Sequence, residues 1–160
     1  MDDYVNAGRW FSILHRRSQL FVVEACQNLH LTFSEYIMLI RLFDQEGAKQ
    51  DELASMLYLD KAVVTRTINL LQEKGFIYRE VDAADRRVKH IYLTEYGKAQ
   101  HRILRNIIQG WIDYLVCDMD PKEVQAIFQG VGQLVDKACA ADLVKLAKKL
   151  PTGDEIHEKM

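Results

Sequence analysis

Residues 60–97 read DKAVVTRTINLLQEKGFIYREVDAADRRVKHIYLTEYG, and this stretch decides the fold. Apolar side chains recur at helical spacing from Val64 through Ile68 to Leu71, which predicts an amphipathic helix with that face in the core. Asp60 precedes the pattern as an N-cap, and Gly75 follows it as the residue past the C-cap. We therefore expect one helix between Asp60 and Gly75.

The outer face of this helix carries side chains that suit the edges of bases in a major groove. Arg66 suits guanine or a phosphate, and Asn69 suits adenine. A solvated helix face is the simpler interpretation of such residues. The residues that we expect to read the groove are Lys61, Val63, Thr65, Arg66 and Asn69.

The segment just upstream favours the DNA-reading interpretation. Residues 48–59 read AKQDELASMLYL and predict a short helix with Leu53, Ala54 and Leu57 on one side. Residues 58–60 then form a connection as tight as a helix-turn-helix requires. The two helices together predict such a motif.

Two short runs after this helix predict a β-hairpin. Residues 76–81 and 88–93 are rich in β-branched and aromatic side chains and alternate in polarity, with Ile91 and Leu93 on one face. A polar connector, DAADRR, joins them at residues 82–87. Helix, hairpin and following helix occur in the order of a winged helix-turn-helix.

The tip of this wing gathers Asp85, Arg86 and Arg87, with Lys89 just beyond. Paired arginines suit a narrow minor groove. We expect Asp85 to hold Arg87 extended through a charge-assisted hydrogen bond, and Arg86 and Lys89 to contact phosphates. The alternative is a hairpin whose charged edge only prevents aggregation.

The flanking segments predict long helices. They span about residues 5–29, 32–45 and 94–117, and a last one starts at Asp120 with Pro121 in its first turn. The fold class is therefore mainly α with a small two-stranded β wing. We expect an N-terminal dimerisation helix at 1–31, a winged helix-turn-helix region at 32–97, C-terminal dimerisation helices at 98–150 and a flexible tail at 151–160.

The chain resembles the MarR family of bacterial transcriptional regulators. The resemblance rests on DKAVVTRTINLLQEKGFIYRE, on DAADRR and on LTEYG, and it extends from about Tyr4 to Leu150. It implies a wing-tip pair at Asp85 and Arg87, base contacts from the five residues named above, and a dimer made by helices from both chain ends. This sequence departs from the family pattern at Tyr58, where a glycine is usual, and at Val63, where a small polar residue is common.

Composition bounds the function. The chain has 160 residues, 49 % of them apolar, and a net charge of −2. Basic charge is concentrated between residues 86 and 105, which hold six Lys or Arg and one acidic residue, Glu95. This placement of basic residues fits DNA contact near the wing. The small net charge predicts few phosphate contacts per subunit, and therefore that DNA binding relies on a dimer.

No catalytic or metal-binding motif is present in the sequence. It lacks GxSxG, HExxH and a phosphate-binding glycine-rich loop, so we expect no enzyme activity and no cofactor. Cys26 and His30 lie four residues apart, but a second pair of zinc ligands is missing, and we expect no metal. The sparse cysteines Cys26, Cys117 and Cys139 fit structural roles in a reducing cytoplasm.

An aromatic or phenolic effector is the regulatory ligand that the resemblance implies, bound between the dimerisation helices and the DNA-binding lobe. The residues that we expect to contribute are Trp10, His15, Arg16 and Tyr36. Core packing of Trp10 and solvation of Arg16 are the alternatives. Neither a membrane-spanning run nor an export leader is apparent, so we expect a cytoplasmic location.

The sequence as a whole predicts a cytoplasmic, homodimeric regulator of the winged helix-turn-helix type. We expect it to bind double-stranded DNA at a pseudo-palindromic operator, as a repressor. A winged-helix module that binds proteins and has lost its DNA function is the alternative, and the near-neutral charge is the feature that favours it.

Overall fold

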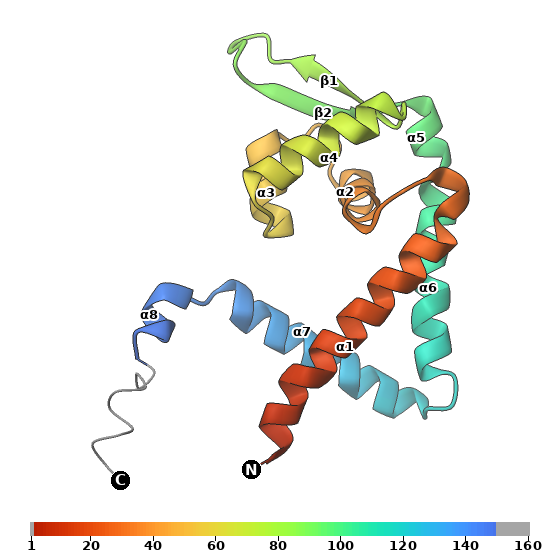
Figure 1. The fold of residues 1–160 in the computed structure, drawn as a ribbon, viewed down its shortest axis with the longest axis vertical. Helices are drawn as coiled ribbons and strands as arrows, with labels where there is room; N and C mark the ends of the chain where they lie inside the picture. Colours follow the sequence, from red (N-terminus) through yellow and green to blue (C-terminus); the bar gives the residue numbers. More distant parts are fainter. Residues whose placement is uncertain (1, 150–160) are drawn as a thin grey trace. The chain divides into compact units, whose positions relative to one another are not determined.

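The computed structural model describes residues 2–149, with side chains described from residue 6 (Figure 1). The chain forms two compact units, Met1–Leu115 and Val116–Met160. Across residues 2–149, no helix combines the length and apolarity that a membrane crossing requires.

The first unit holds the elements that the sequence places around the wing (Figure 1). In chain order these are α1 (Asp2–Ala25), the short 3-10 turn η1 (Gln27–Leu29), α2 (Phe33–Asp44), α3 (Gln50–Leu57), α4 (Lys61–Glu73), β1 (Ile77–Val81), β2 (Lys89–Leu93), α5 (Glu95–Ala99) and α6 (His101–Val116). The predicted winged helix-turn-helix is thus confirmed, with α3 and α4 as its two helices and β1 and β2 as its wing.

The core of this unit lies beneath α4 and the base of the wing. Val64, Ile68 and Leu71 are fully buried, as their helical spacing predicts. Ile91 and Leu93 from one face of β2 join the same apolar cluster. Packing of this cluster fixes the angle at which α4 presents its opposite face.

Side-chain caps begin the principal helices where the sequence places them. The Asp60 carboxylate accepts the backbone N–H of Ala62 at the start of α4. Thr32 and Glu35 form a capping box at the start of α2. Each cap satisfies backbone donors that the first helical turn leaves without a partner.

The wing is an antiparallel pair of strands extended by a third segment. Ile77 is opposite Leu93 and Val81 is opposite Lys89. On the outer edge of β2, the Gly47 N–H donates to the Ile91 carbonyl at 2.9 Å, and the Ile91 N–H donates to the Ala48 carbonyl at 3.1 Å. The segment between α2 and α3 therefore holds the base of the wing in place.

Two predicted boundaries differ from the structure. The first helix ends at Ala25 rather than Leu29, since η1 follows and His30 has a left-handed backbone, with φ of 52°. The helix after the wing is broken at Gln100, whose N–H bonds the Gly97 carbonyl three residues back and so closes α5 as a tight turn. The tail expected at 151–160 lies outside the described residues.

In the second unit, the described residues form α7 (Pro121–Cys139) and α8 (Leu143–Ala147). Asp120 and Glu123 form a capping box at the start of α7, with Pro121 in the first turn. The apolar stripe of α7 is open to solvent in the single chain. Its members Ile127, Phe128, Val131, Leu134 and Val135 are between 40 % and 54 % exposed.

Candidate nucleic-acid interface

The face of α4 that points away from the core carries most of the residues expected to read DNA. Lys61, Val63, Arg66 and Asn69 are exposed, and Thr65 is half-buried. Their position follows from the burial of the opposite face of the helix. Four of the five predicted residues are thus accessible on α4, and Thr65 is partly covered.

The neighbouring helix α3 holds part of this surface. The Gln50 amide donates to the Thr65 hydroxyl at 2.5 Å, and that hydroxyl donates to the Lys61 carbonyl at 2.8 Å. Lys61 also forms an ion pair with Asp51 at 3.0 Å. The Thr65 hydroxyl therefore already accepts one hydrogen bond and donates its only proton, so a single lone pair is left to contact a base. Lys61, in contrast, is an exposed cation that can exchange Asp51 for a phosphate.

Asn69 is held from the wing. The guanidinium of Arg79 on β1 donates to the Asn69 side-chain oxygen and, at 2.6 Å, to the Gln72 side-chain oxygen. An amide oxygen has two lone pairs, so Asn69 keeps one acceptor position and both donors for a base. Sequence reasoning missed Arg79, because nothing in a strand pattern reveals which helical side chain lies beside it.

The turn between α3 and α4 has a left-handed residue at Tyr58, with φ of 51°. Its N–H donates to the Ser55 carbonyl at 3.3 Å, and the next N–H, of Leu59, donates to the Ala54 carbonyl at 3.1 Å. This is the position where the family pattern has glycine, which adopts such a conformation freely. Tyrosine here leaves a side chain that is 72 % exposed beside the reading face.

The tip of the wing is organised by two carboxylates. Asp82 accepts the backbone N–H groups of Ala84 at 2.8 Å and Asp85 at 3.0 Å. Asp85 in turn accepts the backbone N–H of Arg87 at 2.9 Å. The Asp85 carboxylate thus contacts the main chain of Arg87, and among the described residues no ion pair joins it to the Arg87 guanidinium.

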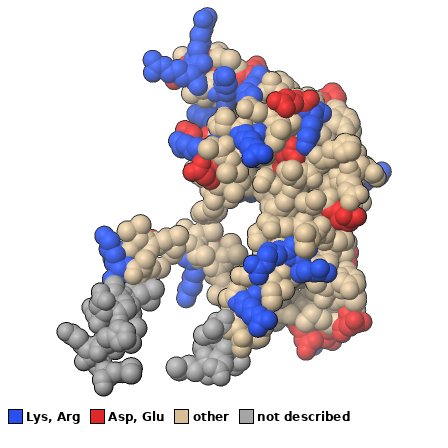
Figure 2. Space-filling model, viewed as in Figure 1, with Lys and Arg blue, Asp and Glu red and all other residues tan. Residues whose placement is uncertain are grey.

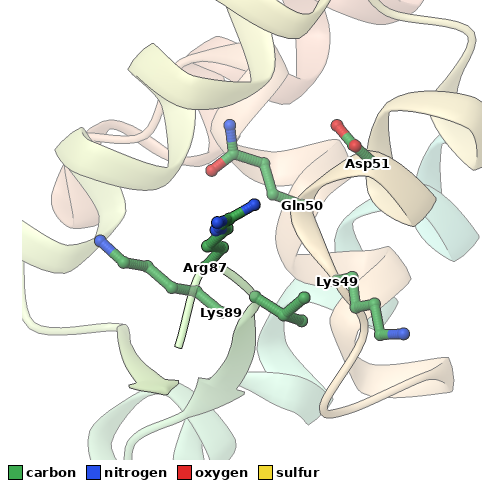
Figure 3. Close-up of a pocket in the computed structure, with 6 residues that line it drawn as sticks. Lys49, Gln50, Asp51, Arg87 and Lys89 are labelled. Atoms are coloured by element: carbon green, nitrogen blue, oxygen red, sulfur yellow. The ribbon is translucent and has the colours of Figure 1, made fainter. Parts of the chain in front are cut away.

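Positive side chains gather at the wing in Figure 2. Arg86, Arg87 and Lys89 are exposed there. Arg87 and Lys89 also line a hollow of about 290 Å³ between the wing and the start of α3. In Figure 3 the Arg87 guanidinium points toward Gln50, while the Lys49 ammonium points away from it. The Arg87 side chain is therefore folded back toward the start of α3.

The charge balance of this hollow suits a phosphate from a DNA backbone. Arg87 and Lys89 outnumber the one carboxylate, that of Asp51, among the lining residues that the structure describes, whereas Lys49 pairs with Glu52 at 4.0 Å. The ion pair between Asp51 and Lys61 offsets that carboxylate. Sequence reasoning did not single out Lys49, because it precedes α3 and lies 38 residues before Arg87.

A histidine near the tip end of β2 also escaped the sequence analysis. His90 Nε2 lies 2.9 Å from an Asp82 carboxylate oxygen, and Nδ1 lies 2.8 Å from the Gly47 carbonyl oxygen. The hydrogen bond from His90, with those from the Asp85 and Ala84 backbones, lowers the pKa of Asp82 to about 2. The bond to Asp82 likewise raises the pKa of His90.

The four residues expected to bind an effector do not share one hollow. Trp10 lines a hollow of about 370 Å³ with Trp111 and Tyr114. Arg16 lines another, of about 520 Å³, with Leu20, Val23, Thr32 and Phe33 among others. Trp10 and Arg16 line different hollows because they lie nearly two helical turns apart on α1.

The other two expected ligand residues are engaged within the protein. Tyr36 is buried, and its hydroxyl donates to the Leu104 carbonyl at 3.1 Å. Burial is the main reason why the pKa of Tyr36 rises to about 12. His15 packs edge-on against Phe33, with ring centroids 5.8 Å apart. Tyr36 is therefore a core residue, and His15 and Phe33 lie beside the Arg16 hollow.

The cysteines differ in environment. Cys26 is buried, and burial raises the pKa of its thiol, which disfavours the reactive thiolate. Cys117 and Cys139 are exposed. Among residues 2–149, the side chains that the structure describes form no group of three or more His, Cys, Asp or Glu able to hold a metal ion.

Known proteins share both the sequence pattern and the fold. The family model named MarR family matches residues 31–89, from the start of α2 to the second strand of the wing. The chain is similar to the uncharacterized HTH-type transcriptional regulator YybA of Bacillus subtilis (strain 168), with 33 % identity over 79 residues. That match covers 49 % of this chain and 53 % of YybA, so the chain spans about half the length of this relative.

Two solved structures extend the likeness beyond the matched segment. A MarR transcriptional regulator from Methanosarcina mazei Go1 has a TM-score of 0.80 and 25 % identity, over 82 % of this chain and 95 % of that one. A MarR family regulator from Listeria monocytogenes, solved in complex with 26mer DNA, shares the fold with a TM-score of 0.78 and 16 % identity, over 91 % of this chain and 96 % of that one. Residues 31–89 therefore match the model of the MarR family, and the chain shares the winged helix-turn-helix fold of these solved structures.

Proposed function

We propose that this protein is a transcriptional regulator that binds a specific sequence of double-stranded DNA. The observation that carries the proposal is the pairing of an exposed α4 face with a basic wing on one compact unit. In this proposal Lys61, Val63, Arg66 and Asn69 enter the major groove. Arg87 leaves its folded-back position for the adjacent minor groove.

The wing and α3 supply the phosphate contacts in this proposal. Arg86 and Lys89 hold the backbone beside the minor groove, and the hollow next to α3 would accept a phosphate once the Lys49 side chain turns toward it from Glu52. Each phosphate contact releases a counterion from the DNA. The logarithm of the affinity therefore falls linearly with the logarithm of the salt concentration, with a slope set by the number of phosphate contacts. The Listeria monocytogenes relative, whose structure contains DNA, supports this reading of the shared fold.

A homodimer is the form that we propose to bind DNA. Each unit of the single chain exposes a row of large apolar side chains, such as Trp10 and Leu20 on α1 and Leu134 on α7. Exposed apolar surface of this kind marks a protein contact. Two-fold pairing would place two copies of α4 one turn of DNA apart, on a pseudo-palindromic operator.

We further propose that the protein acts as a cytoplasmic repressor released by a small aromatic or phenolic anion. The hollow beside Arg16 and Phe33 offers a cation for the anionic group and a ring for stacking. A ligand weakens DNA binding there only if it favours a dimer geometry that misaligns the two α4 helices. Fluorescence titration with benzoate and salicylate, with and without operator, tests this part separately.

The experiment that tests the central proposal is fluorescence anisotropy with DNA from just upstream of the protein's own gene. Unrelated DNA of equal length is the control, and salt is varied from 50 to 300 mM. We expect tight binding that prefers the upstream DNA. The logarithm of the association constant should fall linearly with the logarithm of the salt concentration. If upstream DNA and a genome-wide selection both yield no preferred sequence, the protein is instead a winged-helix module for protein contacts.

A further inference from the structure

His90 lies at the junction between the wing and the body of the first unit. It is on β2, one residue after Lys89, and its side chain is 22 % exposed. Nε2 faces the Asp82 carboxylate at 2.9 Å, and Nδ1 faces the Gly47 carbonyl at 2.8 Å. The ring therefore bridges the first residue of the wing tip and the segment between α2 and α3.

The chemistry of these two partners decides the protonation state of the ring. A carbonyl oxygen and an ionised carboxylate accept hydrogen bonds and donate none. A neutral imidazole has a single N–H and satisfies one of them, whereas the imidazolium donates to both. The bridge seen here is therefore complete only when His90 carries a proton on each nitrogen.

The bridge reaches the DNA-reading arginine through the tip. The Asp82 carboxylate that receives His90 also holds the Ala84 and Asp85 N–H groups. Asp85 then holds the N–H of Arg87. A change in the contact between His90 and Asp82 is thus passed to Arg87 through three short hydrogen-bonded links.

Other charged and titratable groups surround the ring. Lys49, on the segment before α3, disfavours the charged form of His90. Glu80 is its partner across the hairpin on β1. Tyr92, two residues on along β2, has its ring centroid 6.5 Å from that of His90. Asp82 makes the largest contribution, and the balance of these groups favours the imidazolium.

We propose that His90 is a positioning residue of the wing, and that its protonated ring fixes Asp82 and thereby the approach of Arg87 to DNA. This inference rests on the proposed DNA binding. Its consequence is that DNA affinity is high while His90 is charged and falls when the ring loses a proton. The structure assigns this role to a side chain outside the expected contact residues.

The first test needs no DNA. Histidine ¹⁵N chemical shifts of the wild-type protein, followed from pH 5 to 9, give the pKa of His90 and show whether both nitrogens are protonated. We expect a pKa above the ordinary value of 6.5, and exchange of the Ala84 and Asp85 amides that speeds up as His90 titrates. A pKa at or below 6.5 overturns the proposal.

The second test is the pH profile of binding to the selected operator at constant ionic strength. We expect wild-type affinity to fall on the order of five- to tenfold as the pH rises through the pKa of His90. H90Q should bind weakly at low pH and lack this step. H101Q, which removes the exposed histidine on α6, is the matched control and should keep the wild-type profile.

D82N separates positioning from a general structural role. Loss of the carboxylate charge should shift the midpoint of the binding profile to lower pH, because His90 then loses the partner that favours its proton. A structural defect alone would lower affinity at every pH without moving the midpoint. A wild-type profile that matches H90Q, or a midpoint unmoved by D82N, overturns the proposal. Absence of sequence-preferring binding at every pH overturns the proposed function instead.

Discussion

Lys74 Nζ lies 2.6 Å from a carboxylate oxygen of Glu35, although 39 positions separate the two residues. Glu35 is fully buried, and its other oxygen accepts the N–H and the hydroxyl of Thr32. Lys74 also donates to the His30 carbonyl at 2.6 Å. The end of α4 is therefore tied to the segment that begins α2.

Lys74→Met should destabilise the protein, because it leaves the buried Glu35 carboxylate with Thr32 alone. A buried acceptor that loses a charged partner costs about 1–3 kcal/mol. Urea denaturation of the two proteins measures the loss. Lys98→Met is the comparison, since Lys98 pairs with Glu46 at 3.3 Å on the surface, where ion pairs contribute little. Equal stability of Lys74→Met and wild type would show that this link is not stabilising.

Arg87→Ala should weaken operator binding by about 1–3 kcal/mol and leave the fold unchanged, because the residue is exposed at the wing tip. The exposed Arg9→Ala on α1 serves as the control for the loss of one positive charge. Anisotropy titrations of wild type and both variants at one salt concentration give the comparison. Unchanged affinity in Arg87→Ala would remove the wing from the proposed interface.

The His90–Asp82 pair should make stability depend on pH in a defined window. His90 has a raised pKa, so its contribution is complete below its ordinary pKa of 6.5 and is lost as the pH rises through the folded value. Asp82 has its pKa lowered to about 2. Its contribution to the free energy of unfolding is therefore complete above its ordinary pKa of 3.8 and is lost as the pH falls toward 2.

The Tm difference between wild type and H90Q should therefore be largest between about pH 4 and pH 6.5. It should shrink at alkaline pH, where His90 is neutral in both the folded and the unfolded state. Thermal melts from pH 3 to 9 provide the measurement. A difference that stays constant over this range would mean that the ion pair has no part in stability.

Gly97→Ala should destabilise the junction between the wing and α5. A Cβ at this position would lie 2.2 Å from the Phe76 carbonyl oxygen, which accepts the Thr94 N–H at 3.0 Å. Forcing these groups apart costs about 1–3 kcal/mol. In Gly110→Ala, on α6, the new methyl meets no atom within 4 Å, so stability should not fall. Similar chemical denaturation midpoints for the two variants would contradict this packing argument.

Local interactions explain why so much of the fold was predictable from the sequence. The helix spacing of Val64, Ile68 and Leu71 requires one buried face wherever the helix packs. Caps such as Thr32 with Glu35 and Asp120 with Glu123 join residues three positions apart, so the sequence alone determines them. The strand alternation that buries Ile91 and Leu93 has the same local origin.

The tertiary structure alone decided how the side chains of the candidate interface are held. Arg79 meets Asn69, His90 meets Gly47 and Asp82, and Arg87 turns toward Gln50 only after the strands pack beside α3 and α4. Such partners are distant in sequence or lie on different elements, so periodicity and spacing carry no information about them. The sequence therefore determined which surface is presented, and packing determined which side chains on it are free and which are held.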